Sequence, residues 1–197
     1  MRKGNGRTLK EDSVELLEAV ERRGVDYFLH YTPVQNLPSI LQHGILSRKQ
    51  MQLRDIKPVL YHGWGKKWNE LDDYICLSLI PPKTMIKKTK EPQAALLIHP
   101  AIIGQENTCF SPINSAKETI DVDEIFSRDS VEAFEDLFRY EEGTQLRNDF
   151  AEILVKDYIS VTDIQNICFP NWKMAGKLWI KGMLGRSPKI KIVPQLF

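Results

Sequence analysis

Residues 26–47 read DYFLHYTPVQNLPSILQHGILS, and this stretch carries the strongest structural signals in the chain. Its aromatic and large apolar opening predicts a strand over residues 26–32. A short helix should follow, because Pro38 suits a first helical turn and Gly44 supplies a left-handed end. His30 lies inside the predicted strand. A lone histidine among apolar neighbours is more often a hydrogen-bonded core residue than a functional one, so its presence there needs an explanation.

The segments on either side predict an α+β fold. Short strands with few helices favour this class over a doubly wound sheet. Helices are expected over residues 12–24, 129–138 and 171–184, and strands over 74–80, 94–100, 151–155, 164–169 and 188–197, the last at a sheet edge. Residues 47–73 show no regular pattern.

Helix ends and faces can also be predicted. Asp12 should cap the first helix and Gly24 should end it, while Asp129 or Ser130 should cap the second. In the third helix the 3.6-residue period places four side chains on one face: Trp172, Ala175, Trp179 and Met183.

The composition is that of an ordinary globular protein. Of 197 residues, 42% are hydrophobic and 27% charged, and the formal net charge is +1, so any nucleic-acid surface must be local. Three scattered cysteines without CxxC spacing argue against a disulfide scaffold or zinc site and favour a reducing compartment. The sequence has no apolar run of the roughly 20 residues needed to span a bilayer. We therefore expect a cytoplasmic protein that does not enter membranes. We expect a tail and helix over 1–25 and one domain over 26–197.

Several common nucleotide and metal motifs are absent from the sequence. It has neither GxxxxGK[ST] nor a strand–GxGxxG–helix unit, so neither a P-loop nor a Rossmann site is indicated. No His-x-x-x-His or carboxylate spacing surrounds His30, and we therefore predict no metal. His43, His62 and His99 have no evident catalytic partners.

Two other features could be functional or merely structural. Glu152 opens an apolar strand, where a carboxylate is costly unless it is paired or faces a solvated cleft; a strand-edge carboxylate facing water is the simpler interpretation. The basic loop 83–90 could be a solvated connection. With nearby indoles it could also bind the phosphates and bases of single-stranded nucleic acid, through Trp64, Trp68, Lys83, Lys87 and Lys88.

Taken together, four segments resemble the DarT-type ADP-ribosyltransferases, the toxins of DarT–DarG toxin–antitoxin pairs. HYTPVQNLPSILQHGILS is similar to the family's opening H-x-T-x-x-x-N-L-x-x-I-L-x-x-G-[IL]. The segments DDYICLSLIPPKTMI, FAEILVKDYISVTDI and KIKIVPQLF are similar to its central, catalytic and closing strands. The matches occur in the same order as in the family, from about residue 28 to the end.

The resemblance implies the ADP-ribosyltransferase fold, two small mixed or antiparallel sheets around a cleft for NAD⁺. His30 would then bind the adenosine-side ribose, and Thr32 and Asn36 neighbouring ribose and adenine atoms, with Tyr31 also among the cofactor contacts. Gly44 to Leu46 would line the adenine pocket. Arg54, or alternatively Arg48, would bind the pyrophosphate, because arginine forms bidentate phosphate contacts. Glu152 matches the family's catalytic glutamate, and Arg54 would assist it.

The chain departs from the family pattern in three places. Leu77, Ser78 and Leu79 replace a usual F-Y-F, so Ser78 would hold the nicotinamide-side ribose instead of an aromatic shelf. Lys83 replaces a usual arginine. The segment before Glu152, which includes Arg147 as an acceptor contact, carries several acids, and this weakens the expectation of a DNA acceptor.

The leading interpretation is an NAD⁺-dependent mono-ADP-ribosyltransferase that modifies single-stranded DNA or RNA, as a toxin of a toxin–antitoxin or antiviral defence system. Protein ADP-ribosylation or NAD⁺ hydrolysis are alternatives among enzymes. A catalytically silent nucleic-acid-binding module is the alternative of another class. A macrodomain-type or other antitoxin is expected only from the family resemblance.

Overall fold

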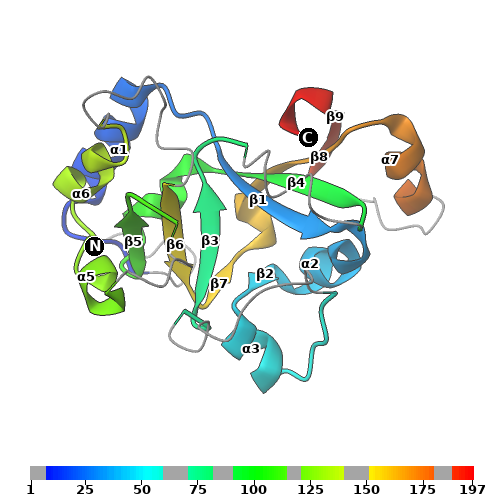
Figure 1. Ribbon diagram of the computed structural model, residues 1–197, viewed down its shortest axis with the longest axis horizontal. Helices are drawn as coiled ribbons and strands as arrows, with labels where there is room; N and C mark the ends of the chain where they lie inside the picture. Colours follow the sequence, from blue (N-terminus) through cyan, green and yellow to red (C-terminus); the bar gives the residue numbers. More distant parts are fainter. Residues whose placement is uncertain (1–7, 60–70, 82–90, 115–120, 140–150, 180–187) are drawn as a thin grey trace.

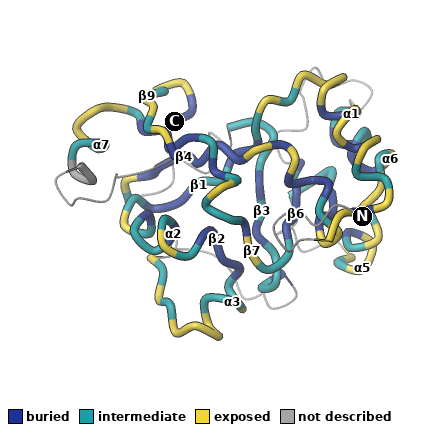
Figure 2. Tube along the Cα trace, turned by 180° about the vertical axis from the view of Figure 1, so that it is seen from behind, coloured by how far each residue is buried: buried dark blue, intermediate teal, exposed yellow. Residues whose placement is uncertain are grey.

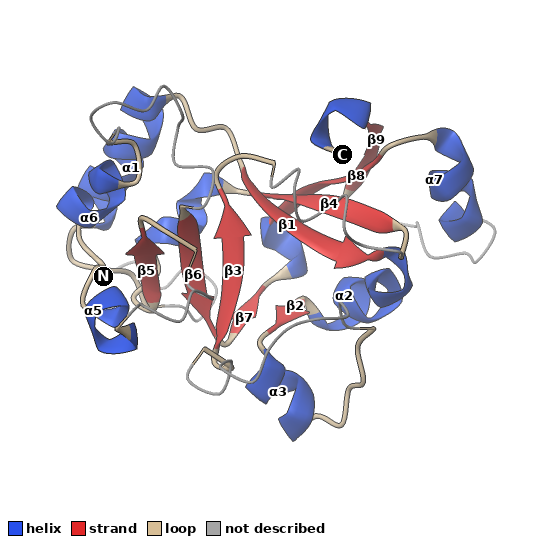
Figure 3. Cartoon of the chain, viewed as in Figure 1, coloured by secondary structure: helices blue, strands red, loops and turns tan. Residues whose placement is uncertain are grey.

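The computed structural model describes residues 8–59, 71–81, 91–114, 121–139, 151–179 and 188–197. The chain combines short helices with mostly antiparallel strands, which confirms the predicted α+β class (Figure 3). The strands are β1 (Phe28–Pro33), β2 (Ile45–Leu46), β3 (Tyr74–Ser78), β4 (Gln93–Ile98), β5 (Thr108–Ser111), β6 (Glu152–Lys156), β7 (Tyr158–Ile159), β8 (Ile164–Phe169) and β9 (Lys189–Ile192). The α-helices are α1 (Ser13–Arg23), α2 (Leu37–His43), α3 (Arg48–Leu53), α5 (Val122–Phe126), α6 (Val131–Asp136) and α7 (Trp172–Trp179), with 3₁₀ turns η1 (Val34–Asn36), η3 (Pro100–Gly104), η4 (Val161–Asp163) and η5 (Pro194–Leu196).

The two sheets differ in size. The larger has seven strands in the order β5-β6-β3-β1-β4-β8-β9, and the smaller pairs β2 with β7. Neighbours in the large sheet are antiparallel except β8 and β9, which are parallel. The prediction of an edge strand at the end of the chain is confirmed by β9. Two sheets are present, as predicted, but they are unequal, because one of them holds most of the strands.

Strand β1 pairs with β4 over its whole length but with β3 at only one position, so β1 and β3 separate in the middle of the sheet. Along β4 it pairs over all six residues, from Phe28 to Pro33. Along β3 it has one register pair, Leu29 with Ser78. Figure 1 shows β1 and β3 diverging below this point, with β2, β7 and α2 beneath the opening. We call this divergence the fork.

The main hydrophobic core covers one face of the large sheet. It combines apolar side chains of the sheet, such as Phe28 and Leu96, with Leu16 of α1, Leu37 of α2 and Phe134 of α6. Figure 2 shows the corresponding buried stretches along β1, β3, β4 and β6. Two smaller clusters lie around the C-terminal residues and around α5.

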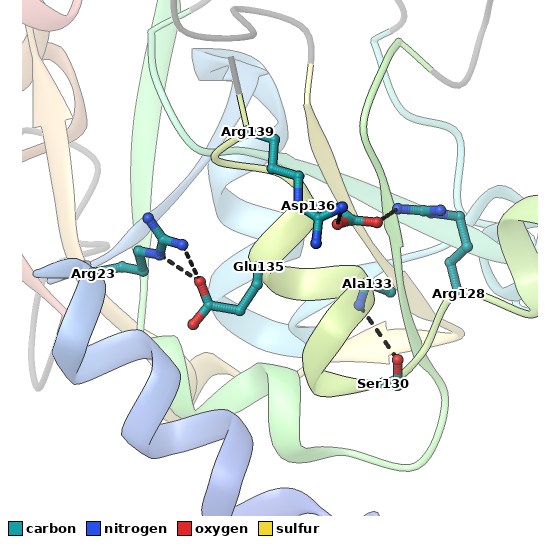
Figure 4. Close-up of polar contacts among 7 residues, drawn as sticks. All are labelled: Arg23, Arg128, Ser130, Ala133, Glu135, Asp136 and Arg139. Carbon is teal, nitrogen blue, oxygen red and sulfur yellow. Dashed lines mark hydrogen bonds and ion pairs between the residues drawn. The ribbon is translucent and has the colours of Figure 1, made fainter. Parts of the chain in front are cut away.

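Helix α1 belongs to this main core, so the N-terminal segment from Ser13 onward is packed against the rest of the domain. Its buried side chains are Leu16, Ala19 and Val20. Arg22 and Arg23 both pair with Glu135 of α6, as Figure 4 shows for Arg23. In the same view Asp136 binds Arg128 at 2.9 Å and Arg139 at 3.0 Å.

Helix ends are partly as predicted. Gly24 is left-handed (φ 62°, ψ 38°), and Ser130, rather than Asp129, caps α6 by accepting a hydrogen bond from the Ala133 N–H. Asp12 precedes α1, but its side chain makes no cap hydrogen bond. Gly44 has a positive φ of 79° with an extended ψ of −177°, so it redirects the chain into β2 and does not form a left-handed end.

Apart from the 3₁₀ turns, five elements were not predicted. Helix α3 lies within the segment expected to be irregular, and β2, β5, α5 and β7 are additional. These elements have two to six residues, too few for a periodic pattern to stand out. In α7, Ala175 is buried and Trp172 is 70% exposed, whereas the side chains of Trp179 and Met183 lie outside the part of the chain that the structure describes, so the common face of the four stays a prediction. Within the described part of the chain, no helix is long and apolar enough to cross a membrane.

Candidate active site

His30 lies at the fork. Its Nδ1 is 3.3 Å from the backbone carbonyl oxygen of Cys76, on the far side of the fork in β3. After the Leu29–Ser78 pair, Tyr31 would stand opposite Cys76 if the antiparallel ladder continued. The imidazole therefore reaches across the fork and binds the backbone of β3. This contact explains how a histidine is tolerated in a half-buried strand position.

The Cys76 contact also fixes the tautomer of His30. A carbonyl oxygen can only accept, so Nδ1 carries the proton and donates it. Burial lowers the pKa of His30, and the hydrogen bond to Cys76 opposes this only in part. The imidazole is accordingly neutral at pH 7, and its Nε2 is a hydrogen-bond acceptor. A ribose hydroxyl is a suitable donor for such a nitrogen.

Thr32 and Asn36 are linked to each other and to a distant part of the chain. The Asn36 amide nitrogen donates to Thr32 Oγ1 at 3.2 Å and to the Val59 carbonyl at 2.9 Å. The Asn36 amide oxygen accepts from the Val59 N–H at 2.8 Å. Thr32 is buried and Asn36 partly buried. Both residues thus lie near His30 in the chain, but the Asn36 amide is already used within the protein.

Gly44 allows β2 to approach β7 closely. Ile45 and Leu46 of β2 pair with Ile159 and Tyr158 of β7. A Cβ on Gly44 would fall well inside van der Waals contact of the Ile159 carbonyl, and its φ of 79° is unfavourable for other residues. Since β7 follows directly after the strand that carries Glu152, this contact ties residues 44–46 to that strand.

Helix α3 is attached to the same region through polar contacts at its beginning. Ser47 caps it through the Gln50 N–H, and the Ser47 N–H donates to the Asp157 carbonyl at 2.8 Å. The Gln50 side chain donates to the Asp157 carboxylate at 3.1 Å. Lys49 pairs with Asp73 at 2.9 Å. Asp157, which has a positive φ of 62°, thus holds the beginning of α3 through its carbonyl and its carboxylate. The sequence analysis did not predict this role.

The two candidate phosphate-binding arginines lie at opposite ends of α3. Arg48, at the start, is 3.7 Å from the Asp72 carboxylate. Arg54, at the C-cap, is exposed, and its guanidinium has no ion-pair or hydrogen-bond partner among the residues that the structure describes. A guanidinium already facing a carboxylate gains less from an added phosphate, so the geometry favours Arg54.

Glu152 occupies a defined place in the strand register. It stands opposite Ser78 of β3 on one side and Ser111 of β5 on the other, and Ser78 in turn stands opposite Leu29. We call Ser78, Glu152 and Ser111 the Glu152 row. Directly opposed residues of antiparallel strands share a face, so the two serines flank the half-buried carboxylate. Ser111 was not predicted; it is fully buried and donates to the Ile113 carbonyl at 2.6 Å.

His30 and the Glu152 row are near each other without sharing a face. Their strands are separated by β3, which places the two backbones about 10 Å apart. Leu154, two residues after Glu152, packs in the α5 cluster, whereas Phe28, two residues before His30, packs in the main core. By strand alternation, Glu152 faces the α5 side and His30 the main-core side, next to the closed end of the fork.

Tyr31 is placed away from this region. Its hydroxyl donates to the Leu196 carbonyl at 2.7 Å, and its ring meets Phe197 edge-on at 6.0 Å. Successive side chains of a strand alternate in direction, so Tyr31 and its neighbour His30 point to opposite faces. The structure therefore gives Tyr31 a role in holding the C-terminus and does not support the prediction of a cofactor contact.

The residues predicted to hold the acceptor lie outside the described part of the chain. They are Trp64, Trp68, Lys83, Lys87, Lys88 and Arg147, and their role stays a prediction. Across the described residues, no group of three or more His, Cys, Asp or Glu side chains is arranged to hold a metal ion.

Sequence comparison identifies one family. A family model described as "ssDNA thymidine ADP-ribosyltransferase, DarT" matches residues 29–197, which include His30, the fork and the Glu152 row. A comparison with curated proteins finds no match.

Solved structures show the same fold at low sequence identity. Thermosipho africanus DarTG in complex with ADP-ribose is 18% identical, with a TM-score of 0.61; the alignment covers 87% of this chain and 51% of that one, so this chain spans about half its length. Thermus sp. 2.9 DarT in complex with NAD⁺ is 14% identical (TM-score 0.55), and the same protein in complex with ADP-ribosylated ssDNA is 15% identical (TM-score 0.59). These two alignments cover 88% of this chain and 98% and 97% of the Thermus chains.

Proposed function

The chain belongs to the DarT family of ssDNA thymidine ADP-ribosyltransferases, and on this premise we propose that it transfers ADP-ribose from NAD⁺ to thymidine in single-stranded DNA. The family match spans the fork, helix α3 and the Glu152 row. Thermus sp. 2.9 DarT, which shares the fold, has been solved with NAD⁺ and with ADP-ribosylated ssDNA. Both the co-substrate and the acceptor of this proposal are therefore represented among proteins of the same fold.

The observation that carries the proposal is the position of Glu152. It is a half-buried carboxylate at the first residue of a core strand, between the aligned positions of Ser78 and Ser111. A carboxylate at this place in the Glu152 row can face a ribose that develops positive charge and can hold one of its hydroxyls.

The reaction explains why a carboxylate is required. The bond between the nicotinamide nitrogen and ribose C1′ breaks, nicotinamide leaves with the electron pair, and positive charge builds on the ribose. A new bond then forms from C1′ to an atom of the acceptor base, which loses a proton. A carboxylate that holds a ribose hydroxyl and faces this charge stabilises the transition state more than the ground state. Glu152, or solvent, can accept the proton.

The remaining residues suit the binding of NAD⁺. The Nε2 of His30 offers an acceptor to a ribose hydroxyl, and the exposed guanidinium of Arg54 can form bidentate contacts with the pyrophosphate. Ser78, opposite Glu152, would hold the nicotinamide-side ribose. A single dinucleotide lying across the closed end of the fork could reach from His30 to Glu152.

An acceptor experiment tests the proposal. Purified protein is incubated with NAD⁺ labelled in the adenylate, together with single-stranded DNA with and without thymidine, the corresponding RNA, or lysate protein. We expect label only on DNA that contains thymidine, with release of one nicotinamide for each ADP-ribose transferred. Label on RNA or on protein would move the proposal to those acceptors. Nicotinamide release without transfer would indicate NAD⁺ hydrolysis, and no reaction would favour a silent binding module.

The biological setting is proposed from the family. A toxin role, with a macrodomain-type or other antitoxin as partner, is supported by the family match and by the fold shared with Thermosipho africanus DarTG. Antiviral defence, an RNA acceptor and a cytoplasmic location stay predictions. Expression in a host with and without Glu152→Gln provides a simple test, since only the active chain should be toxic.

A further inference from the structure

Asn36 binds both the backbone N–H and the backbone carbonyl of Val59, a residue far away in the sequence. Its amide oxygen accepts from the Val59 N–H at 2.8 Å, and its amide nitrogen donates to the Val59 carbonyl at 2.9 Å. The second amide hydrogen is directed to Thr32 Oγ1 at 3.2 Å. We call these three hydrogen bonds the Asn36 clasp.

The clasp uses nearly all the hydrogen-bonding capacity of Asn36. A primary amide has two N–H donors and one oxygen with two lone pairs. Both donors are engaged within the protein, so Asn36 could donate to a nucleotide only by releasing Val59 or Thr32. A contact in which Asn36 donates to adenine or ribose therefore requires the clasp to break, whereas the second lone pair of the amide oxygen can still accept a hydrogen bond.

The clasp holds the segment that carries Arg54. At its beginning this segment is fixed to α3, since Asp55 is left-handed (φ 51°) and the N–H groups of Asp55 and Ile56 donate to Gln52 and Met51. This is the hydrogen-bond pattern of a Schellman motif, with aspartate in place of the usual glycine. At its end stands Val59. Among the described residues, the Asn36 clasp supplies the only hydrogen bonds from residues 54–59 to any part of the chain beyond α3.

We infer that Asn36 is a positioning residue for NAD⁺ binding, which sets the Arg54 segment relative to His30 and Thr32 on β1. The inference rests on the proposed function, because it assigns Arg54 to the pyrophosphate of NAD⁺. Thr32 is buried in β1. The clasp therefore attaches the exposed Arg54 segment to a central strand of the large sheet. Without the clasp, Arg54 keeps its charge but loses its defined position, and binding becomes weaker. The chemical step at Glu152 is left intact, since no part of the clasp touches the Glu152 row.

A double-mutant cycle tests this inference. NAD⁺ affinity is measured by calorimetry for wild type, Asn36→Ala, Arg54→Ala and the double variant. We expect Asn36→Ala to weaken NAD⁺ binding about tenfold, as lost hydrogen bonds of this kind do. Its transfer rate at saturating NAD⁺ should stay within about twofold of wild type, as for a group that stabilises ground and transition states equally. In the Arg54→Ala background, Asn36→Ala should have little further effect.

Two controls separate positioning from general damage. Gln35→Ala removes the neighbouring exposed side chain, which binds Glu91 at 2.8 Å, and should leave NAD⁺ affinity unchanged. Hydrogen exchange of the Val59 amide should be slow in wild type and fast in Asn36→Ala, with the amides of β1 still protected. This exchange measurement needs no ligand and shows directly whether the clasp holds the segment.

The outcomes distinguish this inference from the proposed function. Additive losses from Asn36→Ala and Arg54→Ala would show that Asn36 contacts NAD⁺ independently, and unchanged affinity in Asn36→Ala would remove the role altogether. Either result overturns the inference about Asn36 but leaves the proposed function intact, because the wild type still binds NAD⁺ and transfers ADP-ribose. If wild type does not bind NAD⁺ at all, the proposed function fails first, and the inference falls with it.

Discussion

The Glu152 row and segment 34–59, which runs from η1 to Val59, are built in different ways. The row lies in a continuous antiparallel ladder, where Ser78, Glu152 and Ser111 are aligned by the pairing of three strands. Segment 34–59 lies outside the large sheet and is attached by separate contacts: β2, which follows Gly44, pairs with β7, Ser47 bonds Asp157, and Asn36 bonds Thr32 of β1. The comparison suggests a division of tasks, in which strand register sets the chemistry and the separate contacts set the binding of NAD⁺.

The largest effect is expected from the Glu152 row. Glu152→Gln keeps the shape of the side chain but removes its negative charge, so the rate of ADP-ribose transfer should fall on the order of 10²–10³. Transfer is measured with saturating NAD⁺ and single-stranded DNA. Glu18→Gln, on the exposed side of α1, is the matched control and should transfer normally. A rate within a few-fold of wild type would remove the catalytic role of Glu152.

A second prediction concerns the contact between segment 34–59 and β7. Gly44→Ala introduces a Cβ into the Ile159 carbonyl at a φ of 79°, and should cost about 3 kcal/mol of unfolding free energy, measured with urea. Gly24→Ala is an informative control, since its φ is also positive but its φ of 62° and ψ of 38° lie in the left-handed region that other residues can adopt, and nothing lies within 4 Å of the added atom. It should cost only about 1 kcal/mol. Equal losses in the two variants would mean that the close approach to β7 contributes nothing.

The two ends of α3 provide a third prediction. Arg54→Ala should weaken NAD⁺ binding about tenfold or more, because a charge-assisted phosphate contact is lost. Arg48→Ala should leave NAD⁺ affinity nearly unchanged. It should lower the free energy of unfolding by about 1 kcal/mol instead, because Asp72 loses the cation 3.7 Å away. Calorimetry and urea unfolding of both variants give the comparison. The opposite pattern would assign the pyrophosphate to Arg48.

The smallest predicted effect is a pH dependence of stability from His30. Burial lowers the pKa of His30 in the folded state, so the unfolded chain binds more protons below pH about 6.5. The contribution of neutral His30 is complete above this pH and is lost as pH falls toward the folded pKa, at no more than about 1.4 kcal/mol per pH unit. His30→Gln should lack this loss. The difference in unfolding free energy between wild type and variant should be constant from pH 8 to 7 and should fall below pH 6.5.

A constant difference down to pH 5 would contradict the lowered pKa of His30. The other three histidines are common to both proteins and cancel in the comparison.

The features that depend on local sequence patterns could be predicted, whereas those that depend on contacts between distant residues could not. The α+β class, the strand of His30 and the strand of Glu152 could be predicted, because local patterns of apolar residues specify them. Strand alternation alone indicates that Tyr31 and His30 face opposite ways, and the structure shows the Tyr31 hydroxyl bound to the Leu196 carbonyl. The preference for Arg54 over Arg48 stays a prediction, and the contact of Arg48 with Asp72 that bears on it was hidden in the sequence, because Asp72 lies far along the chain. The clasp was equally hidden, since it joins Asn36 to a residue 23 positions away.

The division of tasks between the two regions is tested most directly by two measurements on the same preparation of Glu152→Gln. One is NAD⁺ affinity by calorimetry, and the other is the single-turnover rate of ADP-ribose transfer to thymidine-containing single-stranded DNA. We predict affinity within about threefold of wild type and a rate lower by on the order of 10²–10³. Loss of NAD⁺ affinity as large as that of Arg54→Ala, or a rate close to that of wild type, would contradict the account.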